Sequence, residues 1–484
     1  MTTENMKLSR RGFLGLGAAA TAAAAAAGLA GCAPKTKAET GPAEPEGYTW
    51  ETAPEPITEV DATEETDVVV IGGGIAGFSA ACSAAEKGAK VVLLEKTGAG
   101  QFRGIDYGAI GGKLQLEAGI DLRDRKQDVL QEVLRWGDHR GDYRVVKAWV
   151  DHSAEALDWA ADMLTNHGIT IAPMPMEMQV IPDAWYEHYA TDAFQIVPTD
   201  ELIAEGGEAG YEPPFAIGWA KAFTAYAGEL GVDVRFNTEA LQLVQDEAGA
   251  VAGVVCEDKA GVTRIDAKAV VMATGGYGND EEMMDAFIPG HAEDVHNIST
   301  PPHNTGDGIV MCEKVGASMW HMHGIAGFWP HVVSLDGTGF TSNLEMIDSG
   351  YGILVGTNGR RFTPECPAVS YGNNTRVALD LKLTNGNRHG DYQSGGEWMT
   401  RHLPAVSWGI FDAAGFEKAT TYFPFDDPVA EGFAYSADTI EGLAAQIDVP
   451  VEELTRTVAT WNAMLQNGGD TQFYRADDGV APIV

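Results

Sequence analysis

One stretch, residues 67–96, constrains the fold of this chain more than any other. Residues 67–71 read Asp-Val-Val-Val-Ile, a short β-branched run typical of a buried parallel strand. Residues 72–77 follow with the spacing G-x-G-x-x-G. An alanine-rich stretch, which we expect to be helical from about Phe78 to Lys87, leads to a second apolar strand that ends on Glu95. This order of strand, glycine loop, helix, strand and acid predicts a dinucleotide-binding unit.

Each glycine of the loop has a physical reason to be there. Gly72 permits the tight turn, Gly74 lets the main chain approach a pyrophosphate, and Gly77 lets the helix pack closely on the strand. The N–H groups at the start of the helix would bind the phosphates. Glu95 stands where a carboxylate binds a ribose hydroxyl. The pattern therefore predicts an α/β fold with a nucleotide site.

Composition narrows the function classes. The 484 residues suit two or three domains, and 70 acidic against 32 basic residues give a net charge of −38, which argues against nucleic-acid binding. The five cysteines form neither C-x-x-C nor C-x-x-C-H. We therefore predict no metal site, iron–sulfur cluster, thiol-redox pair or c-type haem. Three cysteines in apolar surroundings are expected in the core: Cys82, Cys256 and Cys312.

The first residues of the sequence have the pattern of an export signal. Arg10 and Arg11 precede a short alanine-rich apolar run, the pattern of a twin-arginine signal. Leu29-Ala30-Gly31-Cys32 resembles a lipobox, whose cysteine would carry a lipid. We expect a twin-arginine and lipoprotein signal over 1–32 and a flexible tether over 33–66, rich in Pro, Glu, Thr and Ala. The protein is then exported to the cell envelope, periplasmic or extracytoplasmic, and anchored at Cys32.

Two strings carry a family resemblance. The loop with its L-L-E-K ending, and an apolar strand that runs into A-T-G-G at 273–276, resemble the FAD-dependent fumarate reductase and succinate dehydrogenase flavoprotein superfamily. The resemblance implies a Rossmann-like FAD-binding domain over 67–315, an inserted α+β capping domain over 316–430 and a helical segment over 431–484. It favours FAD over NAD. The covalent flavin link of some members uses a histidine soon after E-K. Because the first histidine after Glu95 is His139, non-covalent FAD is expected.

The resemblance also assigns cofactor contacts. Ala240 follows a strand at 231–236 that matches the adenine-contacting strand, and Asp307 lies in a T-G-D-G segment beside the flavin, although a plain helix N-cap with a glycine turn is the alternative. The implied contacts are Gly72, Gly74, Ile75, Ala76, Gly77, Glu95, Lys96, Gly111, Gly112, Ala240, Ala273, Thr274, Gly275 and Asp307.

Residues 350–365, GYGILVGTNGRRFTPE, match the capping-domain pattern of the superfamily, but the active site departs from it. In fumarate reductases an arginine shortly beyond the final glutamate donates the proton, whereas here none occurs between Glu365 and Arg376. The Q-x-H-P-T histidine is replaced by W-H-M-H-G at 320–324. A small dicarboxylate needs two fixed cations. Trp320 and Trp329 instead favour a larger aromatic or amphipathic acceptor, unless they are capping-domain core.

The implied chemistry is hydride transfer from reduced flavin to one carbon of an activated double bond and a proton to the other. We predict Tyr371 as the first candidate proton donor and Arg376 as the second, with His321 and His323 binding or polarising a carbonyl. Lacking a haem motif and an NAD site, this CH–CH oxidoreductase would serve anaerobic respiration. It would reduce a small-molecule acceptor with electrons from a membrane cytochrome or quinol-linked donor.

Two other functions stay open. One is a ketosteroid-type flavin dehydrogenase, and the other is a truncated, non-catalytic flavin-binding lipoprotein. The second arises because the A-G-E motif that follows the helices in the superfamily is not found before Val484, so we expect a chain truncated at its C-terminus. Those helices are expected from an N-cap at Ser436 to Leu443 and from Val451 to Leu465.

Overall fold

The computed structural model of the protein describes residues 47–52, 55–102, 107–136, 141–173, 181–182, 187–189, 191–197, 199–205, 214–287, 303–320, 322, 331–333, 340–343, 352–362, 365, 407–420, 427–473 and 481–484. The chain divides into the units 1–52 and 53–484. The first contributes the 3₁₀ turn η1 (Thr49–Glu51), beside which the rings of Tyr48 and Trp50 stack. All the other described helices and strands belong to the second unit.

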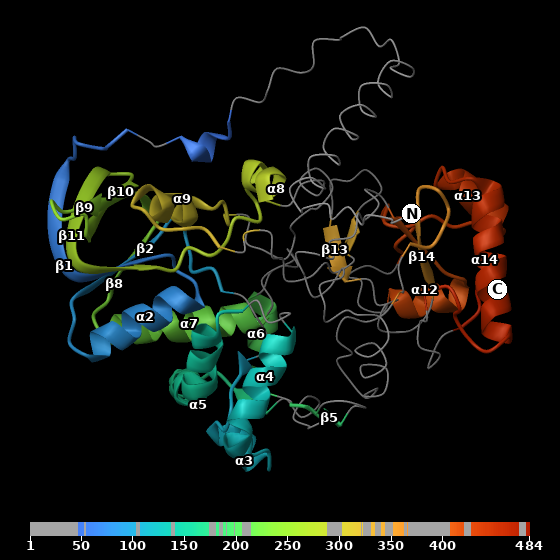
Figure 1. Cartoon of the computed structure of the whole chain (residues 1–484), viewed down its shortest axis with the longest axis horizontal. Helices are drawn as coiled ribbons and strands as arrows, with labels where there is room; N and C mark the ends of the chain where they lie inside the picture. The colour runs from blue at the N-terminus through green and yellow to red at the C-terminus, as the bar shows by residue number, and fades with distance from the viewer. Residues whose placement is uncertain are drawn as a thin grey trace, which may run out of the picture. The chain divides into compact units, whose positions relative to one another are not determined.

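A six-stranded sheet organises the N-terminal half, with the order β8-β2-β1-β11-β10-β9. The first four strands in this order run parallel to one another, and the last two run antiparallel to their neighbours. The strands are β1 (Ala62–Ile71), β2 (Val91–Glu95), β8 (Asp233–Phe236), β9 (Glu239–Gln245), β10 (Val251–Asp258) and β11 (Gly261–Met272). Figure 1 shows helices α2 (Ile75–Glu86) and α7 (Pro214–Glu229) together below the strands.

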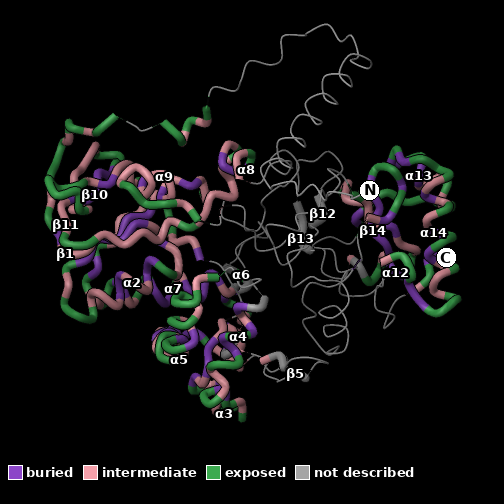
Figure 2. The backbone as a smooth tube through the Cα atoms, viewed as in Figure 1, coloured by how far each residue is buried: buried purple, intermediate pink, exposed green. Residues whose placement is uncertain are grey.

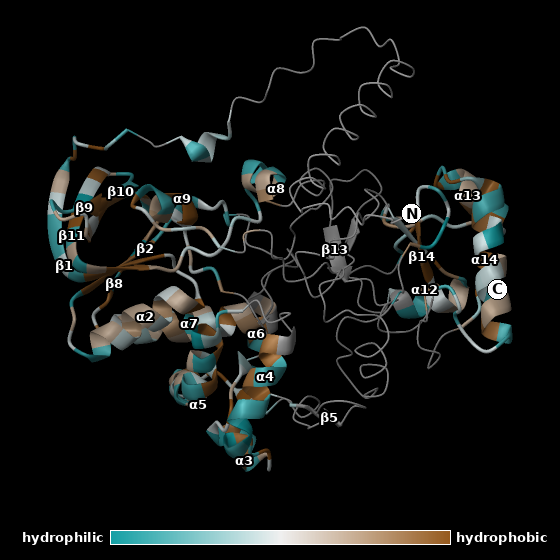
Figure 3. Cartoon of the chain, viewed as in Figure 1, coloured by the Kyte–Doolittle hydropathy of each residue, from teal (hydrophilic) through white to brown (hydrophobic). Residues whose placement is uncertain are grey.

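The two faces of the sheet bury different side chains because alternate residues point to opposite sides. Val70 and Leu93 join α2 and α7 in one core. Val69 and Leu94 join side chains of β9, β10 and helix α9 (Asp307–Lys314) in another. Cys82 and Cys256 lie in these cores and Cys312 packs against the second, as predicted. The interior of the sheet is buried in Figure 2 and mostly apolar in Figure 3.

Three element boundaries differ from the sequence expectation. β1 begins at Ala62 because its first half pairs with 263–267 of β11, so the end of the predicted 33–66 tether is strand. α2 begins at Ile75, since Gly74 already caps it. Ser436 is not a helix N-cap. Instead, Thr439 caps helix α13 (Ile440–Gln446) by accepting a hydrogen bond from Gly442 N. A threonine oxygen at that position satisfies a free N–H of the first turn.

A helical layer and small sheets extend the second unit. Helix α5 (Tyr143–Asn166) carries an apolar stripe that is buried against α4 (Lys126–Trp136), α7 and the neighbouring short strands. The stripe includes Val150, Met163 and Leu164. The remaining helices of this layer are α3 (Lys113–Glu117), η2 (Arg123–Arg125), α6 (Asp200–Glu205) and α8 (Glu281–Phe287). The short strands are β3 (Tyr107–Gly108), β4 (Ile171–Ala172), β5 (Ile181–Pro182), β6 (Glu187–His188), β7 (Asp192–Ile196), β12 (His331–Val333) and β13 (Phe340–Asn343).

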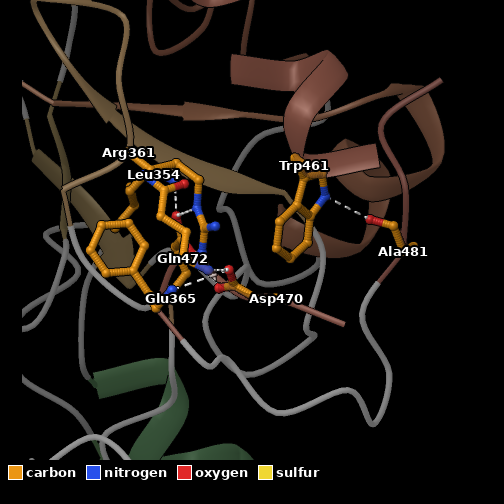
Figure 4. A network of polar contacts seen from close by, with 8 residues as sticks. Leu354, Arg361, Glu365, Trp461, Asp470, Gln472 and Ala481 are labelled. Atoms are coloured by element: carbon orange, nitrogen blue, oxygen red, sulfur yellow. Dashed lines mark hydrogen bonds and ion pairs between the residues drawn. The ribbon is translucent and has the colours of Figure 1, made fainter. Parts of the chain in front are cut away.

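A separate core forms where β14 (Ile353–Gly356) pairs with β15 (Ser407–Ile410), and α13 and α14 (Val451–Gln466) pack beside it. Helix α12 (Ala413–Ala419) follows β15. The buried guanidinium of Arg361 lies over the Trp461 ring and donates to Glu365 Oε1 at 2.9 Å and to Asp470 Oδ2 at 2.8 Å, as Figure 4 shows. Among the helices in the described ranges, none combines the length and apolar character that a membrane crossing needs.

Candidate cofactor-binding site

The glycine loop lies where β1 meets the end of β11. Gly72 adopts a φ of +107°, its N–H donates to Leu94 O, and a Cβ there would lie 2.2 Å from Ala273 O. A Cβ on Gly77 would lie 1.8 Å from Gly72 O. The loop therefore cannot carry side chains at these positions without moving the main chain. Gly74 caps α2 without a side chain, which leaves the N–H groups at the start of that helix facing the pocket described below.

Glu95, at the end of β2, is 6 % exposed and turned toward the loop. Its Oε2 accepts a hydrogen bond from Gly73 N at 2.7 Å. Its Oε1 accepts from Thr97 N and Thr97 Oγ1, both at 2.8 Å. An ionised carboxylate has about four acceptor sites, so capacity for a ribose hydroxyl is left. This arrangement fits the predicted role of Glu95.

Two further segments close the site from the far part of the sequence. The strand β11 delivers Ala273, Thr274 and Gly275 beside the loop, because Ala273 N donates to Ile71 O at 2.8 Å. The turn before β9 is held by Thr238 N, which donates to Glu95 O at 3.0 Å. Ala240, at the start of β9, lines the same pocket as Ile71 and Leu94, and its contact with adenine stays a prediction.

These segments enclose a pocket of about 670 Å³, a volume typical of ligand sites. Burial raises the pKa of the Cys312 thiol, which also lines it, so that thiol stays neutral near pH 7. The lining comprises residues 71–76, 94–96, 101, 238–240, 272–275, 303–309, 311–313, 317–320 and 322. The structure thus brings together most of the predicted cofactor contacts.

Residues 67–483 match a protein-family model described as an FAD binding domain. The chain belongs to this FAD-binding family. FAD is therefore the cofactor of this flavoprotein, and the predictions of the superfamily, of the α/β Rossmann-like fold and of an FAD-dependent oxidoreductase family are confirmed. The non-covalent attachment stays a prediction.

Relatives and solved structures agree with the family. A probable fumarate reductase of Shewanella frigidimarina is 26 % identical over 86 % of this chain and 61 % of its own length. A vinyl phenol reductase of Lactiplantibacillus plantarum is 27 % identical over 84 % of this chain and 78 % of its own. The open conformation of a flavocytochrome c3 fumarate reductase matches with a TM-score of 0.59 and 26 % identity, covering 87 % of this chain and 65 % of that one. This chain thus spans less than two thirds of the length of the Shewanella frigidimarina protein.

Three predicted contacts lie outside the lining of the FAD pocket. Gly77 does not line the pocket, but its lack of a side chain lets α2 pack closely against Gly72 of the loop. Gly111 has a φ of +84°, and Gly112 N donates a hydrogen bond to Gln115 Oε1 at 3.1 Å at the start of α3. Their assignment as FAD contacts stays a prediction. The four predicted catalytic residues Tyr371, Arg376, His321 and His323 fall outside the described residues and stay predictions as well.

Sequence reasoning missed several pocket residues of the flavoprotein. Gly73, Thr305 and Met322 stand inside strings quoted above and could have been found there, whereas Gln101 and Thr238 belong to no motif. Tyr277 was missed too. Its hydroxyl donates to Met322 O, and burial raises the pKa of this phenol to about 12. Tyr277 therefore stays protonated and fixes Met322 in the lining.

Proposed function

We propose that this flavoprotein reduces an activated carbon–carbon double bond. The observation that carries the proposal is the FAD pocket, whose lining includes most of the residues that the superfamily resemblance named. The names of the relatives, a probable fumarate reductase and a vinyl phenol reductase, supply the reaction class. Both names describe a substrate with a double bond conjugated to an electron-withdrawing or aromatic group.

When bound, reduced FAD supplies a hydride for one carbon of such a bond. The chain's own residues have three tasks. The glycine loop and the start of α2 bind the diphosphate through N–H groups, and Glu95 orients the ribose. Tyr371, or Arg376 in its place, delivers the proton to the second carbon. A residue able to polarise a neighbouring carbonyl, for which His321 and His323 are the candidates, lowers the barrier further.

The acceptor in this proposal is larger than fumarate and aromatic or amphipathic. Two observations support this: no arginine occurs between Glu365 and Arg376, and the side chains of Met319, Trp320 and Met322 line the pocket. Trp320 is 61 % exposed and offers an aromatic face.

The electron donor is proposed to be a membrane cytochrome or a quinol-linked carrier, and the place of work the cell envelope in anaerobic respiration. The Arg10–Arg11 pair and Cys32 support this location. The sequence contains no c-type haem motif, which supports a separate donor.

Anaerobic stopped-flow spectroscopy tests the reaction. The full-length flavoprotein is reduced and mixed with fumarate, urocanate, hydroxycinnamates and vinyl phenols, while flavin absorbance is followed. We expect at least one aromatic acceptor to reoxidise the flavin about tenfold faster than fumarate, a difference of about 1.4 kcal/mol in activation free energy. If molecular oxygen reoxidises it rapidly and no acceptor does, the proposal is wrong.

The same experiment tests the proton donor. Tyr371→Phe keeps the ring and removes the hydroxyl, and we expect the single-turnover rate to fall by about 100-fold or more. Tyr143→Phe, at an exposed position on α5, is the matched control and should change nothing. If Tyr371→Phe reacts normally and Arg376→Lys does not, the second candidate takes the role.

A further inference from the structure

An ion pair joins two walls of the FAD pocket. Lys96 directly follows Glu95 at the end of β2, and its Nζ lies 2.6 Å from Asp307 Oδ2 and 2.8 Å from Thr305 Oγ1. The hydroxyl of Thr305 donates in turn to Asp307 Oδ1 at 2.9 Å. Asp307 is the first residue of α9 and stands 211 positions from Lys96 in the sequence. All three residues line the pocket.

The charges around this ion pair are unbalanced. Lys96 is the one lysine or arginine among the described residues that line the pocket, whereas the carboxylates of Glu95, Glu239, Asp307 and Glu313 all line it. The diphosphate of FAD adds two negative charges. Among the described lining residues, the N–H groups at the start of α2 are the donors placed to bind this diphosphate. Without Lys96, the Asp307 carboxylate would face a dianion uncompensated.

The solvent exposure of Lys96 and Asp307 determines whether their ion pair matters more for FAD binding or for folding stability. The side chains of Lys96 and Asp307 are 27 % and 39 % exposed. Ion pairs this accessible to water contribute little to folding stability. Their value rises when a further anion enters the same site and displaces water, because the effective dielectric constant falls. The contacts of Lys96 should therefore matter for FAD binding more than for the stability of the empty protein.

We propose that Lys96 is a positioning residue for cofactor loading. It neutralises Asp307 and, through Asp307 and Thr305, holds the start of α9 against the end of β2. The start of α9 and the end of β2, which both line the pocket, are then held at the distance from each other that binding of FAD requires. The proposal does not depend on the acceptor or on the reaction direction, so its failure is separable from that of the proposed function.

Titration of the full-length apoprotein with FAD, followed by quenching of flavin fluorescence, tests the proposal. We expect Lys96→Met to weaken FAD binding about tenfold, because an unpaired carboxylate then repels the diphosphate. Adding Asp307→Asn to that variant should restore most of the affinity, because the repulsive charge is gone. If the double variant binds as weakly as Lys96→Met or more weakly, the proposal is overturned, since Lys96 or Asp307 then contacts FAD directly.

Three controls exclude a structural explanation. Lys268→Met breaks the Lys268–Asp67 ion pair, also 2.6 Å long but outside the pocket, and should leave FAD affinity unchanged. The thermal unfolding of the apoprotein should be the same for Lys96→Met and Lys268→Met. If Lys96→Met destabilised the apoprotein enough to account for its weaker FAD binding, the positioning role would be overturned. Lys96→Arg keeps the charge and should bind FAD within about threefold of the unmodified protein.

Discussion

At Gly77 even the smallest side chain would collide with the main chain. The Cβ of an alanine there would lie 1.8 Å from Gly72 O, a contact that no rotamer can relieve because both atoms are fixed by the backbone. Gly228, inside α7, offers the opposite situation, since a Cβ there meets nothing within 4 Å. Substituting each glycine by alanine therefore distinguishes two effects. Gly77→Ala tests the lack of space beside the loop, and Gly228→Ala tests helix propensity alone.

We expect Gly77→Ala to lose FAD and to lower the free energy of unfolding by about 1–3 kcal/mol, the usual effect of overpacking. The ratio of flavin to protein absorbance after purification should fall about tenfold or more, in keeping with the displaced loop. Gly228→Ala should keep its flavin and gain about 0.5–1 kcal/mol in stability. A yellow Gly77→Ala protein with unchanged stability would contradict this account.

The buried Arg361 network has a pH dependence that can be derived. Burial raises the pKa of the Asp470 carboxyl, but the hydrogen bond and charge of Arg361 lower it more, so the pKa lies below the ordinary 3.8. A lowered folded-state pKa stabilises the protein above the unfolded-state value, and this stabilisation is lost as the pH falls through the folded-state value.

Asp470→Asn should therefore cost about 1–3 kcal/mol near neutral pH, because a buried guanidinium loses a charged partner. The gap between the urea midpoints of the two proteins should be constant above about pH 5 and shrink below about pH 4. Glu453→Gln, which removes a partly exposed carboxylate on α14, is the control with a smaller effect. A gap that widened in acid would refute the assigned direction.

Among the elements, α7 joins the sheet to the helical layer through one aromatic cluster. The fully buried ring of Phe223 lies 5.8 Å from Phe78 on α2, 5.9 Å from Phe102 and 5.4 Å from Trp219. Such rings bury a large apolar area and attract one another beyond that burial. Through Phe78 the cluster includes α2, the helix whose first residues line the FAD pocket.

Phe223→Ala should lower the free energy of unfolding by about 3–5 kcal/mol, because it removes a buried ring and leaves a cavity. Denaturant titration of the holoprotein measures the change. Thr224→Ala, the exposed neighbour on the same helix, should stay within about 0.5 kcal/mol of the unmodified protein. Equal effects of the two substitutions would show that α7 is not held by this cluster.

Elements were predictable from the sequence where local chemistry decides them. The strand–loop–helix–strand at 67–96 carries its own signal, because glycines and apolar residues act on near neighbours. The start of β1 at Ala62 was not predictable, since its polar first half is strand only through pairing with β11. The Arg361–Asp470 contact was equally hidden, because 109 positions separate two charged residues that pattern reading places at the surface.

At the scale of the molecule, FAD should act as a folding ligand. A ligand that binds only the folded state stabilises it by about 2.7 kcal/mol at one hundred times its dissociation constant. Removing FAD should therefore lower the unfolding temperature, and adding it back should restore the temperature in a concentration-dependent way. Differential scanning calorimetry checks this, with NAD as the control dinucleotide. An unfolding temperature that FAD leaves unchanged would contradict a pocket built into the core of the sheet.

The family and the cofactor could be read from the sequence because the motif residues gather in space as the motifs imply. The substrate could not, because no spacing rule ties the candidate proton donors Tyr371 and Arg376 to the pocket. The net charge of −38 argued against nucleic acids as partners, but it did not indicate which partner the protein has.

The sheet order has a consequence for how the protein is made. Its central strand β1 has β2 on one side and β11 on the other, and β11 is synthesised almost two hundred residues later. A nascent chain can form the glycine loop early, but Ala273 and Asp307, which complete the pocket, are still untranslated. Ribosome-bound chains that stop before α9 should therefore leave FAD in solution, and flavin capture should mark a late moment of synthesis.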